Sequence, residues 1–323
     1  MAQSGTIKAM ILDAAAEARA SALASRFPEV RFHPCASYDD VSPILAEHRP
    51  EAVLTFKIPG KPYPRTSLLE APSVKWIHVG GAGVDHFLPW DPGRIRITNS
   101  SGIHGDIMAQ YVLCAVLMVN QRFPTYSRQQ HDRRWQKHLS TSIAGQTLTV
   151  IGFGHVGSAI GELAKRAGMR VIGVRNRPEP SEAAHEVVGT DRLRWAVGQA
   201  DHVVVILPLS EATRGSIDAS VIAAIKPRAH LINVSRGGIV DETALLVALR
   251  SGALGALTMD VFATEPLPKD SAFWTEENVV LTPHSSSDIE GWQSRVVDLF
   301  ARNLENWLAD RPLINLVDPA RGY

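Results

Sequence analysis

Three short segments in the last third of the chain carry residues suited to acid–base and electrostatic chemistry. Each follows an apolar run, and the segments contain Arg236, Glu265 and His284. An arginine can bind a carboxylate and polarise a carbonyl, and a histidine can donate a proton near neutral pH. A carboxylate beside that histidine favours its protonated form. The set therefore supplies a cation, a proton donor and a group that keeps the donor charged.

The segments that position these residues are typical of buried parallel strands. Near-continuous apolar runs, without polar alternation, indicate strands covered by helices on both faces. From residue 147 onward they are Leu148–Ile151, Val171–Val174, Val203–Leu207, Leu231–Val234, Leu257–Val261 and Val279–Thr282. Sheets of this kind bind ligands beyond the carboxyl ends of their strands, which is where the three residues follow.

The first hundred residues show a second alternating pattern. Strands are predicted at Lys8–Leu12, Val30–His33, Ala52–Phe56, Trp76–Val79 and Ile95–Thr98, with a helix at Ala14–Arg26. The fold class is therefore α/β, with two Rossmann-like domains built on parallel sheets. We expect residues 102–287 to form one domain and residues 1–101 with 288–323 the other. The domain that contains residues 1–101 is discontinuous because a last helix, near Asp288–Ala309, returns to it.

A helix between the two regions is apolar on nearly every side. Asp106 is predicted to cap it, and it runs to about Asn120. Such a helix must be buried all round, either in a core or against a partner subunit. The polar stretch Arg128–His138 that follows is expected to be exposed.

A glycine-rich turn lies between the strand Leu148–Ile151 and a predicted helix at Ser158–Ala167. The first glycine permits the tight turn, the second lets the backbone approach a pyrophosphate, and the third lets the helix pack on the strand. The N–H groups at the start of the helix then face the phosphates. The residues of this predicted dinucleotide site are Gly152, Phe153, Gly154, His155, Val156 and Gly157.

The next strand ends in Arg175, Asn176 and Arg177, which we also assign to the cofactor site. NAD enzymes place a carboxylate about 20 residues past the glycines to hold the ribose 2′-hydroxyl. A guanidinium there can instead pair with a 2′-phosphate. We therefore predict NADP as the preferred cofactor, with NAD second. In the alternative reading, both arginines are solvated loop charges.

Composition excludes several classes of partner. Lys and Arg number 33 and Asp and Glu 33, so no strong field favours nucleic acid or a membrane surface. The N-terminal residues Met1–Ser4 lack the profile of a secretion signal. The two cysteines form no C-x-x-C pair, and the histidines form no zinc motif. We expect no metal site and a cytoplasmic location.

The chain resembles the D-isomer-specific 2-hydroxyacid dehydrogenase family over essentially its whole length. The matching blocks are Val79–Asp85, the glycine turn, Leu207-Pro208-Leu209 with Thr213, Ser235-Arg236-Gly237, Asp260–Leu267 and Thr282-Pro283-His284. Within the family, Arg122-Phe123, Gln129-Gln130 and Trp135 resemble the glyoxylate/hydroxypyruvate reductase branch.

The resemblance implies reduction of a small 2-keto acid to the D-2-hydroxy acid. Arg236 would bind the carboxylate and polarise the ketone, His284 would donate the proton, and Glu265 would pair with His284. Backbone N–H groups of Gly80, Gly81, Ala82 and Gly83 would also hold the substrate carboxylate. Asp260 would lie near the nicotinamide amide, and the cofactor site would include Leu207, Pro208, Thr213, Val234 and Ser235. The resemblance also implies a homodimer built partly on the apolar helix.

Two other classes of protein share parts of this pattern. Corepressors on the same fold share the reactive residues and act as nucleotide-sensing binding proteins, although this chain lacks the long polar tail expected of one. An L-lactate-type dehydrogenase would carry its glycine turn near the N-terminus, whereas about 150 residues precede it here.

Overall fold

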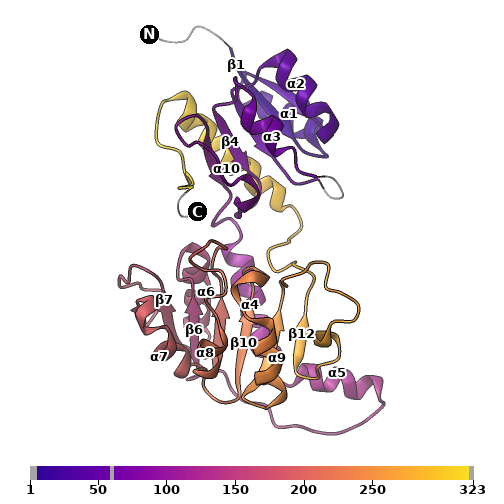
Figure 1. Ribbon diagram of the computed structural model, residues 1–323, viewed down its shortest axis with the longest axis vertical. Coiled ribbons are helices and arrows are strands. Elements are labelled where there is room, and N and C mark those ends of the chain that lie inside the picture. The colour runs from indigo at the N-terminus through magenta and orange to yellow at the C-terminus, as the bar shows by residue number, and fades with distance from the viewer. Residues whose placement is uncertain (1–5, 59–61, 320–323) are drawn as a thin grey trace. The chain divides into compact units, whose positions relative to one another are not determined.

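The computed structural model describes residues 6–58 and 62–319, which fall into two compact units (Figure 1). One unit comprises Met1–Ile103 with Glu290–Tyr323, and the other comprises His104–Ile289. The predicted domain limits, after 101 and after 287, lie two residues before these divisions. The residues Met1–Ser4, for which no secretion signal was predicted, lie outside the described part.

The first unit is built on a five-stranded parallel sheet in the order β2-β1-β3-β4-β5. Helices α1 and α10 pack on one face, and α2 and α3 pack on the other. The central strands β1, β3 and β4 are mostly buried and apolar because both faces are covered, whereas the edge strand β2 includes the exposed Arg31. The elements are β1 (Ile7–Leu12), α1 (Ala16–Arg26), β2 (Val30–Cys35), α2 (Val41–His48), β3 (Ala52–Thr55), α3 (Arg65–Glu70), β4 (Trp76–Val79), β5 (Arg96–Asn99) and α10 (Trp292–Leu308).

Helix α10 makes this unit discontinuous, as the sequence predicted. It follows the whole second unit in the chain and returns to the sheet of the first (Figure 1). The fully buried ring of Trp76 in β4 stacks on Phe300 at 5.0 Å and on Trp307 at 5.6 Å between ring centroids. The helix therefore completes the core of the first unit.

The second unit has a seven-stranded parallel sheet in the order β12-β11-β10-β9-β6-β7-β8. Helices α4 and α6 cover one face, and α7, α8 and α9 lie on the other side. The elements are α4 (Gly105–Asn120), α5 (Phe123–His131), β6 (Thr147–Ile151), α6 (His155–Arg166), β7 (Arg170–Val174), β8 (Glu186–Val188), α7 (Leu193–Gly198), β9 (His202–Val205), α8 (Ala219–Ala223), β10 (Ala229–Asn233), α9 (Glu242–Arg250), β11 (Leu254–Met259) and β12 (Val279–Leu281).

The predicted fold class, two Rossmann-like domains with parallel sheets, is confirmed. The order of the second sheet reverses between β6 and β9, and such a reversal is where doubly wound folds bind dinucleotides. Short 3-10 turns complete the described elements: η1 (Tyr38–Asp40), η2 (Asp85–Phe87), η3 (Thr190–Arg192), η4 (Gly237–Ile239) and η5 (Ala272–Trp274). No helix within the described ranges has the length and apolarity needed to cross a bilayer.

The helix α4 departs from its prediction in two ways. Its N-cap position is His104 and not Asp106, because the helix starts two residues earlier than predicted and leaves Asp106 in the first turn. There its negative charge faces the positive end of the helix dipole. Moreover, the chain itself buries only one side of the helix: Met108 and Val112 are buried, whereas Leu117 is 39% exposed. Burial on all sides would therefore require a partner.

The stretch Arg128–His138 is also only partly as predicted. Residues 130–137 are exposed, and the indole of Trp135 is 98% exposed. Gln129, in contrast, is buried, and its side-chain amide nitrogen lies 2.7 Å from Nε2 of His138. The stretch also contains the end of an unpredicted helix, α5.

Two buried histidines join neighbouring strands in the second unit. The Nδ1 atoms of His202 in β9 and His230 in β10 lie 3.2 Å apart, and Nε2 of His230 lies 2.9 Å from Oγ1 of Thr258. Burial lowers the pKa of His202 to about 4, against a smaller opposing effect of the Asp201 charge. Burial also lowers the pKa of His230 well below 6.5. Both rings are therefore neutral at physiological pH.

This pair predicts acid destabilisation over a defined range. The unfolded chain protonates His202 below pH 6.5, whereas the folded protein resists until about pH 4. The free energy of unfolding should therefore fall as the pH is lowered through this window, by about 3 kcal/mol from this residue. Urea unfolding at several pH values measures it. His202→Gln should flatten the dependence, and His131→Gln, at an exposed site, should not. Identical pH dependence in all three proteins would contradict the prediction.

Candidate active site

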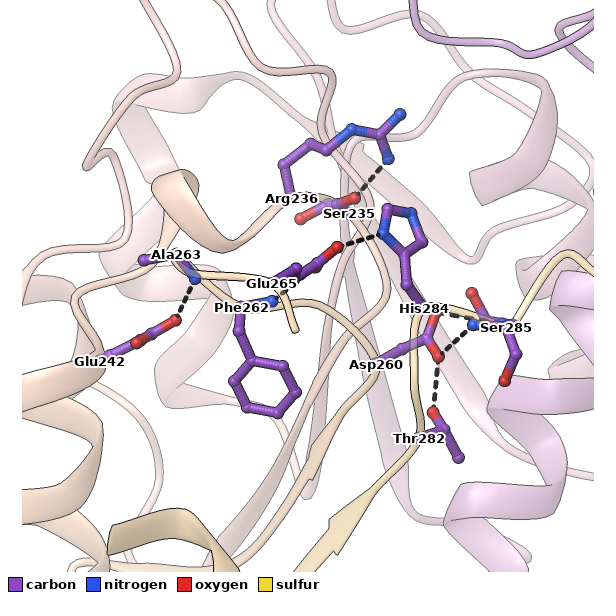
Figure 2. Close-up of polar contacts among 11 residues, drawn as sticks. Ser235, Arg236, Glu242, Asp260, Phe262, Ala263, Glu265, Thr282, His284 and Ser285 are labelled. Atoms are coloured by element: carbon purple, nitrogen blue, oxygen red, sulfur yellow. Dashed lines mark hydrogen bonds and ion pairs between the residues drawn. The ribbon is translucent and has the colours of Figure 1, made fainter. Parts of the chain in front are cut away.

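Arg236, Glu265 and His284 lie on three loops at one edge of the second sheet. The loops follow β10, β11 and β12, which are adjacent and parallel, so their carboxyl ends meet. Figure 2 shows the Glu265 side chain reaching the imidazole of His284, with the guanidinium of Arg236 drawn above the ring. The structure thus brings the three predicted residues to one edge of the second unit.

The contact between His284 and Glu265 fixes the roles of the ring nitrogens. Nδ1 of His284 lies 2.8 Å from Oε2 of Glu265. A carboxylate only accepts, so Nδ1 carries the proton in this bond. The other carboxylate oxygen, Oε1, accepts from the backbone N–H of Phe262 at 2.9 Å. Glu265 is thereby held in place, and Nε2 of a 42% exposed imidazole is left for a ligand.

The backbone at His284 is constrained by a buried carboxylate. His284 has a φ of 54°, in the left-handed region, and its N–H donates to the carbonyl of Asp260 at 2.8 Å. Asp260 is 1% exposed, and its carboxylate accepts from Oγ1 of Thr282 and from the N–H groups of Ser285 and Ser286, at 2.6, 2.8 and 3.0 Å. Left-handed residues persist where the surroundings enforce them. Asp260 therefore holds the loop that presents His284, and its predicted contact with nicotinamide stays a prediction.

Arg236 leaves the sheet on a loop that is packed tightly against the loop of Glu265. Its Nη1 donates to the carbonyl of Ser235 at 2.8 Å. A Cβ added to Gly237 would lie 1.9 Å from the carbonyl carbon of Phe262 and 2.1 Å from N of Ala263. Only glycine allows such an approach, so the backbones that carry Arg236 and Glu265 are in direct contact.

The glycine turn after β6 contains two glycines that the fold needs and one that it does not. Gly152 has a φ of 104°, and a Cβ there would lie 2.3 Å from the carbonyl oxygen of Ile206. A Cβ at Gly157 would lie 2.4 Å from the carbonyl oxygen of Gly152. At Gly154, by contrast, a Cβ would meet no protein atom within 4 Å. That open space at the start of α6 fits a group that approaches from outside, as a pyrophosphate would.

The remaining predicted cofactor residues are spread along the same edge. The side chain of Phe153 is fully buried in the core, so only its backbone can face a ligand, whereas His155 and Val156 begin α6. Thr213 donates from Oγ1 to the carbonyl of Pro208 at 2.6 Å and so closes the turn that starts at Leu207. Val234 and Ser235 are buried at the end of β10.

Arg175 is engaged in an ion pair that the sequence did not reveal. Its Nη2 lies 2.7 Å from Oε2 of Glu179, and its Nε donates to the carbonyl of Arg177 at 2.7 Å. The side chains of Asn176 and Arg177 are exposed beside it. The guanidinium therefore lies at the end of β7, as expected, but it already forms an ion pair with the carboxylate of Glu179.

In the first unit, the loop Gly80–Gly83 follows β4, and two of its carbonyl groups accept hydrogen bonds from neighbouring residues. Asn99 donates from Nδ2 to the carbonyl of Ala82 at 2.7 Å, and the N–H of Ser100 donates to the carbonyl of Gly81 at 3.0 Å. In the described residues, the exposed N–H groups of Gly81 and Ala82 donate to no protein acceptor. Successive N–H groups without a protein acceptor are able to bind an anion when they point the same way.

A buried chain of hydrogen bonds underlies this loop. Trp76 donates to Oγ1 of Thr98 at 2.9 Å, and this oxygen lies 2.7 Å from Nδ1 of His78. On the other side of the ring, Nε2 of His78 lies 3.2 Å from Oγ of Ser100. The Ser100 hydroxyl in turn donates to the carbonyl of Val79 at 2.9 Å. Burial lowers the pKa of His78 to about 3, so the ring is neutral. The two ends of the chain fix its direction: Nε2 of His78 carries the proton.

Comparisons with known proteins agree with this fold. The model of the D-isomer specific 2-hydroxyacid dehydrogenase NAD binding domain matches residues 113–286. A glyoxylate reductase of Thermococcus litoralis is 30% identical over 251 residues, 73% of this chain and 75% of that protein. Glyoxylate/hydroxypyruvate reductase A of Yersinia enterocolitica is 26% identical over 268 residues, 80% and 85% of the two chains.

A solved structure extends the match to almost the entire chain. A D-isomer specific 2-hydroxyacid dehydrogenase of Xanthobacter autotrophicus Py2, in complex with NADPH and MES, has a TM-score of 0.85 and 30% identity, and the match covers 99% of this chain and 100% of that one. Fold and site together define a nicotinamide-dependent oxidoreductase. The chain belongs to the D-isomer-specific 2-hydroxyacid dehydrogenase family, which confirms the predicted resemblance.

Several supporting residues were missed by sequence reasoning. Tyr111 lies 2.6 Å from Oγ1 of Thr282 and so extends the network around Asp260. Glu242 accepts from the N–H of Ala263 at 2.6 Å. Tyr111 lies in the helix that the sequence marked only as apolar, and no sequence pattern distinguished Glu242 from other carboxylates. The described residues contain no group of three potential metal ligands.

The glycine turn yields a prediction about the cofactor. Gly154→Ala adds a methyl group only where a ligand would come, so NADPH affinity should fall on the order of tenfold, equivalent to about 1.4 kcal/mol, while the unfolding midpoint stays near wild type. Gly157→Ala forces a backbone clash and should lower the midpoint. Fluorescence titration with NADPH and thermal unfolding test both. Wild-type affinity in Gly154→Ala would show that this glycine does not serve the cofactor.

Proposed function

We propose that this protein reduces a small 2-keto acid of the glyoxylate or hydroxypyruvate kind to the D-2-hydroxy acid. The observation that carries the proposal is the 2.8 Å bond between Nδ1 of His284 and Oε2 of Glu265, which leaves Nε2 of the imidazole exposed. An imidazolium held in this way is a proton donor with a defined direction. The glyoxylate reductases among the relatives support the choice of substrate class.

In this proposal each residue has one task. Arg236 binds the substrate carboxylate and draws electron density toward the ketone oxygen. A bound nicotinamide supplies the hydride that reduces the carbonyl carbon. His284 donates its Nε2 proton to the oxygen as negative charge develops there, and Glu265 stabilises the imidazolium before that transfer. The loop Gly80–Gly83 adds N–H donors for the carboxylate.

In this proposal the two units bind different ligands. We assign residues 102–287 to the dinucleotide and residues 1–101 with 288–323 to the substrate, in agreement with the NAD binding domain model at residues 113–286. The open space at Gly154 supports a pyrophosphate in the second unit, and the free N–H groups of Gly81 and Ala82 support an anion in the first. Asp260, Leu207, Pro208, Thr213, Val234 and Ser235 remain proposed cofactor residues.

A homodimer is part of the proposal. The exposed residues of α4 are Asp106, Gln110, Cys114 and Leu117, so this side is apolar toward the end of the helix, where Leu113 is half-exposed. Pairing with a second copy would bury this side and satisfy the expectation that the helix is covered all round.

The Glu265–His284 pair predicts a change in the pH profile. Glu265→Gln removes the negative charge that favours imidazolium, so the high-pH decline of keto-acid reduction should move to lower pH. His284→Ala should lose most activity and keep NADPH affinity. Initial rates with glyoxylate and hydroxypyruvate between pH 5 and pH 9, together with NADPH titrations, give the answer. An unchanged profile in Glu265→Gln would refute the pairing, and no turnover of any 2-keto acid by wild type would refute the function.

Cofactor preference gives a separate prediction. A 2′-phosphate paired with Arg175 gains roughly 1.5–3 kcal/mol, so NADPH should be preferred over NADH by about ten- to a hundredfold in kcat/KM. Because Glu179 already holds this guanidinium, we expect the lower end of that range. Arg175→Asp should shift preference to NADH. Arg166→Asp, the same charge change on α6 where Arg166 pairs with Glu162, should not. A wild-type preference for NADH would overturn the assignment.

A further inference from the structure

Two carboxylates hold consecutive backbone N–H groups in the loop that carries Glu265. Oε1 of Glu265 accepts from Phe262 at 2.9 Å, and Oε1 of Glu242 accepts from the next residue, Ala263, at 2.6 Å (Figure 2). The first carboxylate contacts His284, whereas the second comes from helix α9. A residue on a separate element therefore holds the loop of the proton-donor pair.

The placement of Glu242 is unfavourable for a purely structural residue. Burial raises the pKa of its carboxyl, the N–H of Ala263 lowers it, and the negative charge of Glu265 raises it again. A glutamine would accept the same hydrogen bond without desolvating a charge or facing a second carboxylate. The start of α9 is already capped by Asp241, which accepts from the N–H of Ala244 at 3.0 Å. Glu242 therefore does not cap α9, although the helix dipole favours a negative charge in this first turn.

The peptide that Glu242 holds is also the one that Gly237 touches. A Cβ at Gly237 would lie within 2.2 Å of three backbone atoms of Phe262 and Ala263, so these backbones are in contact. Arg236 immediately precedes this point. A shift of the Phe262–Ala263 peptide would therefore move Glu265 and Arg236 together, and Glu242 restrains that shift from the opposite side through its hydrogen bond.

We propose that Glu242 is a positioning residue that fixes the Glu265 loop against the Arg236 loop, and that its negative charge adds to that of Glu265 in keeping His284 protonated. The inference rests on the proposed function and extends it to a residue outside the reacting groups. The loops that meet at this edge carry the charged groups Glu265, Asp260, Glu242 and Arg236, of which Glu265 contacts the imidazole of His284. Of these, Asp260 is already occupied by three donors from the His284 loop.

Three substitutions separate the two parts of the proposal. Glu242→Gln keeps the acceptor and removes the charge, Glu242→Asp keeps the charge and shortens the reach, and Glu242→Ala removes both. Glu305→Gln, at an exposed position of α10 in the first unit, is the matched control for a change of net charge. Each protein is assayed for kcat and KM in keto-acid reduction across pH, for NADPH affinity and for thermal unfolding.

The expected results differ between the variants. Glu242→Gln should move the high-pH decline of reduction lower by a few tenths of a pH unit, with kcat at low pH near wild type. Glu242→Asp should keep the pH profile and lose kcat on the order of tenfold, because the loop is no longer held in the productive geometry. Glu242→Ala should show both effects, and NADPH affinity should be unchanged throughout. A wild-type profile in Glu242→Gln, or wild-type kcat in Glu242→Asp, would overturn the proposal.

A measurement without turnover distinguishes this proposal from the proposed function. The ring resonances of His284, assigned by comparison with His284→Ala, can be followed by NMR as pH is varied in the full-length protein. Their titration midpoint should be lower in Glu242→Gln than in wild type and unaltered in Glu305→Gln. If wild type reduces no keto acid but this shift is present, the function fails and the role of Glu242 stands. If the shift is absent, the role of Glu242 fails whatever the activity.

Discussion

The site depends on one hydrogen bond, between Nδ1 of His284 and the carboxylate of Glu265. Because of this bond, Nδ1 of the imidazole carries a proton that it donates to Glu265, and Nε2 is the nitrogen left to exchange a proton with a ligand. Everything around it limits the movement of one partner or the other. Asp260 holds the backbone of the histidine loop, while Phe262 and Glu242 hold the loop of the glutamate. In the proposed reaction, a proton donor on a flexible loop would lose this directional preference, so the rigid surroundings would contribute to the chemistry.

The same edge of the sheet also explains why glycines recur where they do. Gly152, Gly157 and Gly237 are placed where a side chain would collide with backbone, so they are required for the loops to approach one another. Gly154 is different, because only open space lies beside it. The order of the glycines in the turn predicted this division for Gly152, Gly154 and Gly157. The close approach at Gly237 was not predicted, because it depends on how two loops meet in space. The structure separates a glycine needed by the fold from one whose empty side is available to a ligand.

Much of the fold could be predicted because the information is local. Buried parallel strands are apolar on both faces, so runs such as Leu148–Ile151 and Trp76–Val79 mark them without further context. The short edge strand β8 was missed because Glu186–Val188 has no such run. The start of α4 was misplaced by two residues because Asp106 suits both a cap and a first turn. The resemblance supplied the pairing of Glu265 with His284. The pairs Arg175–Glu179 and Glu242–Ala263 were not foreseen, because each depends on how a loop is folded in space.

The position of α10 in the chain has a consequence for synthesis. Trp76 is made early, yet its stacking partners Phe300 and Trp307 emerge only after the entire second unit. On the ribosome, the first five strands must therefore wait with one face of their sheet incompletely covered while about 190 residues follow, at a rate of about 5–20 residues per second. The second unit, which is continuous in sequence, can fold during this delay. The nascent chain thus exposes the side of the sheet that carries Trp76 for many seconds, and such exposed apolar surface is prone to aggregation during translation.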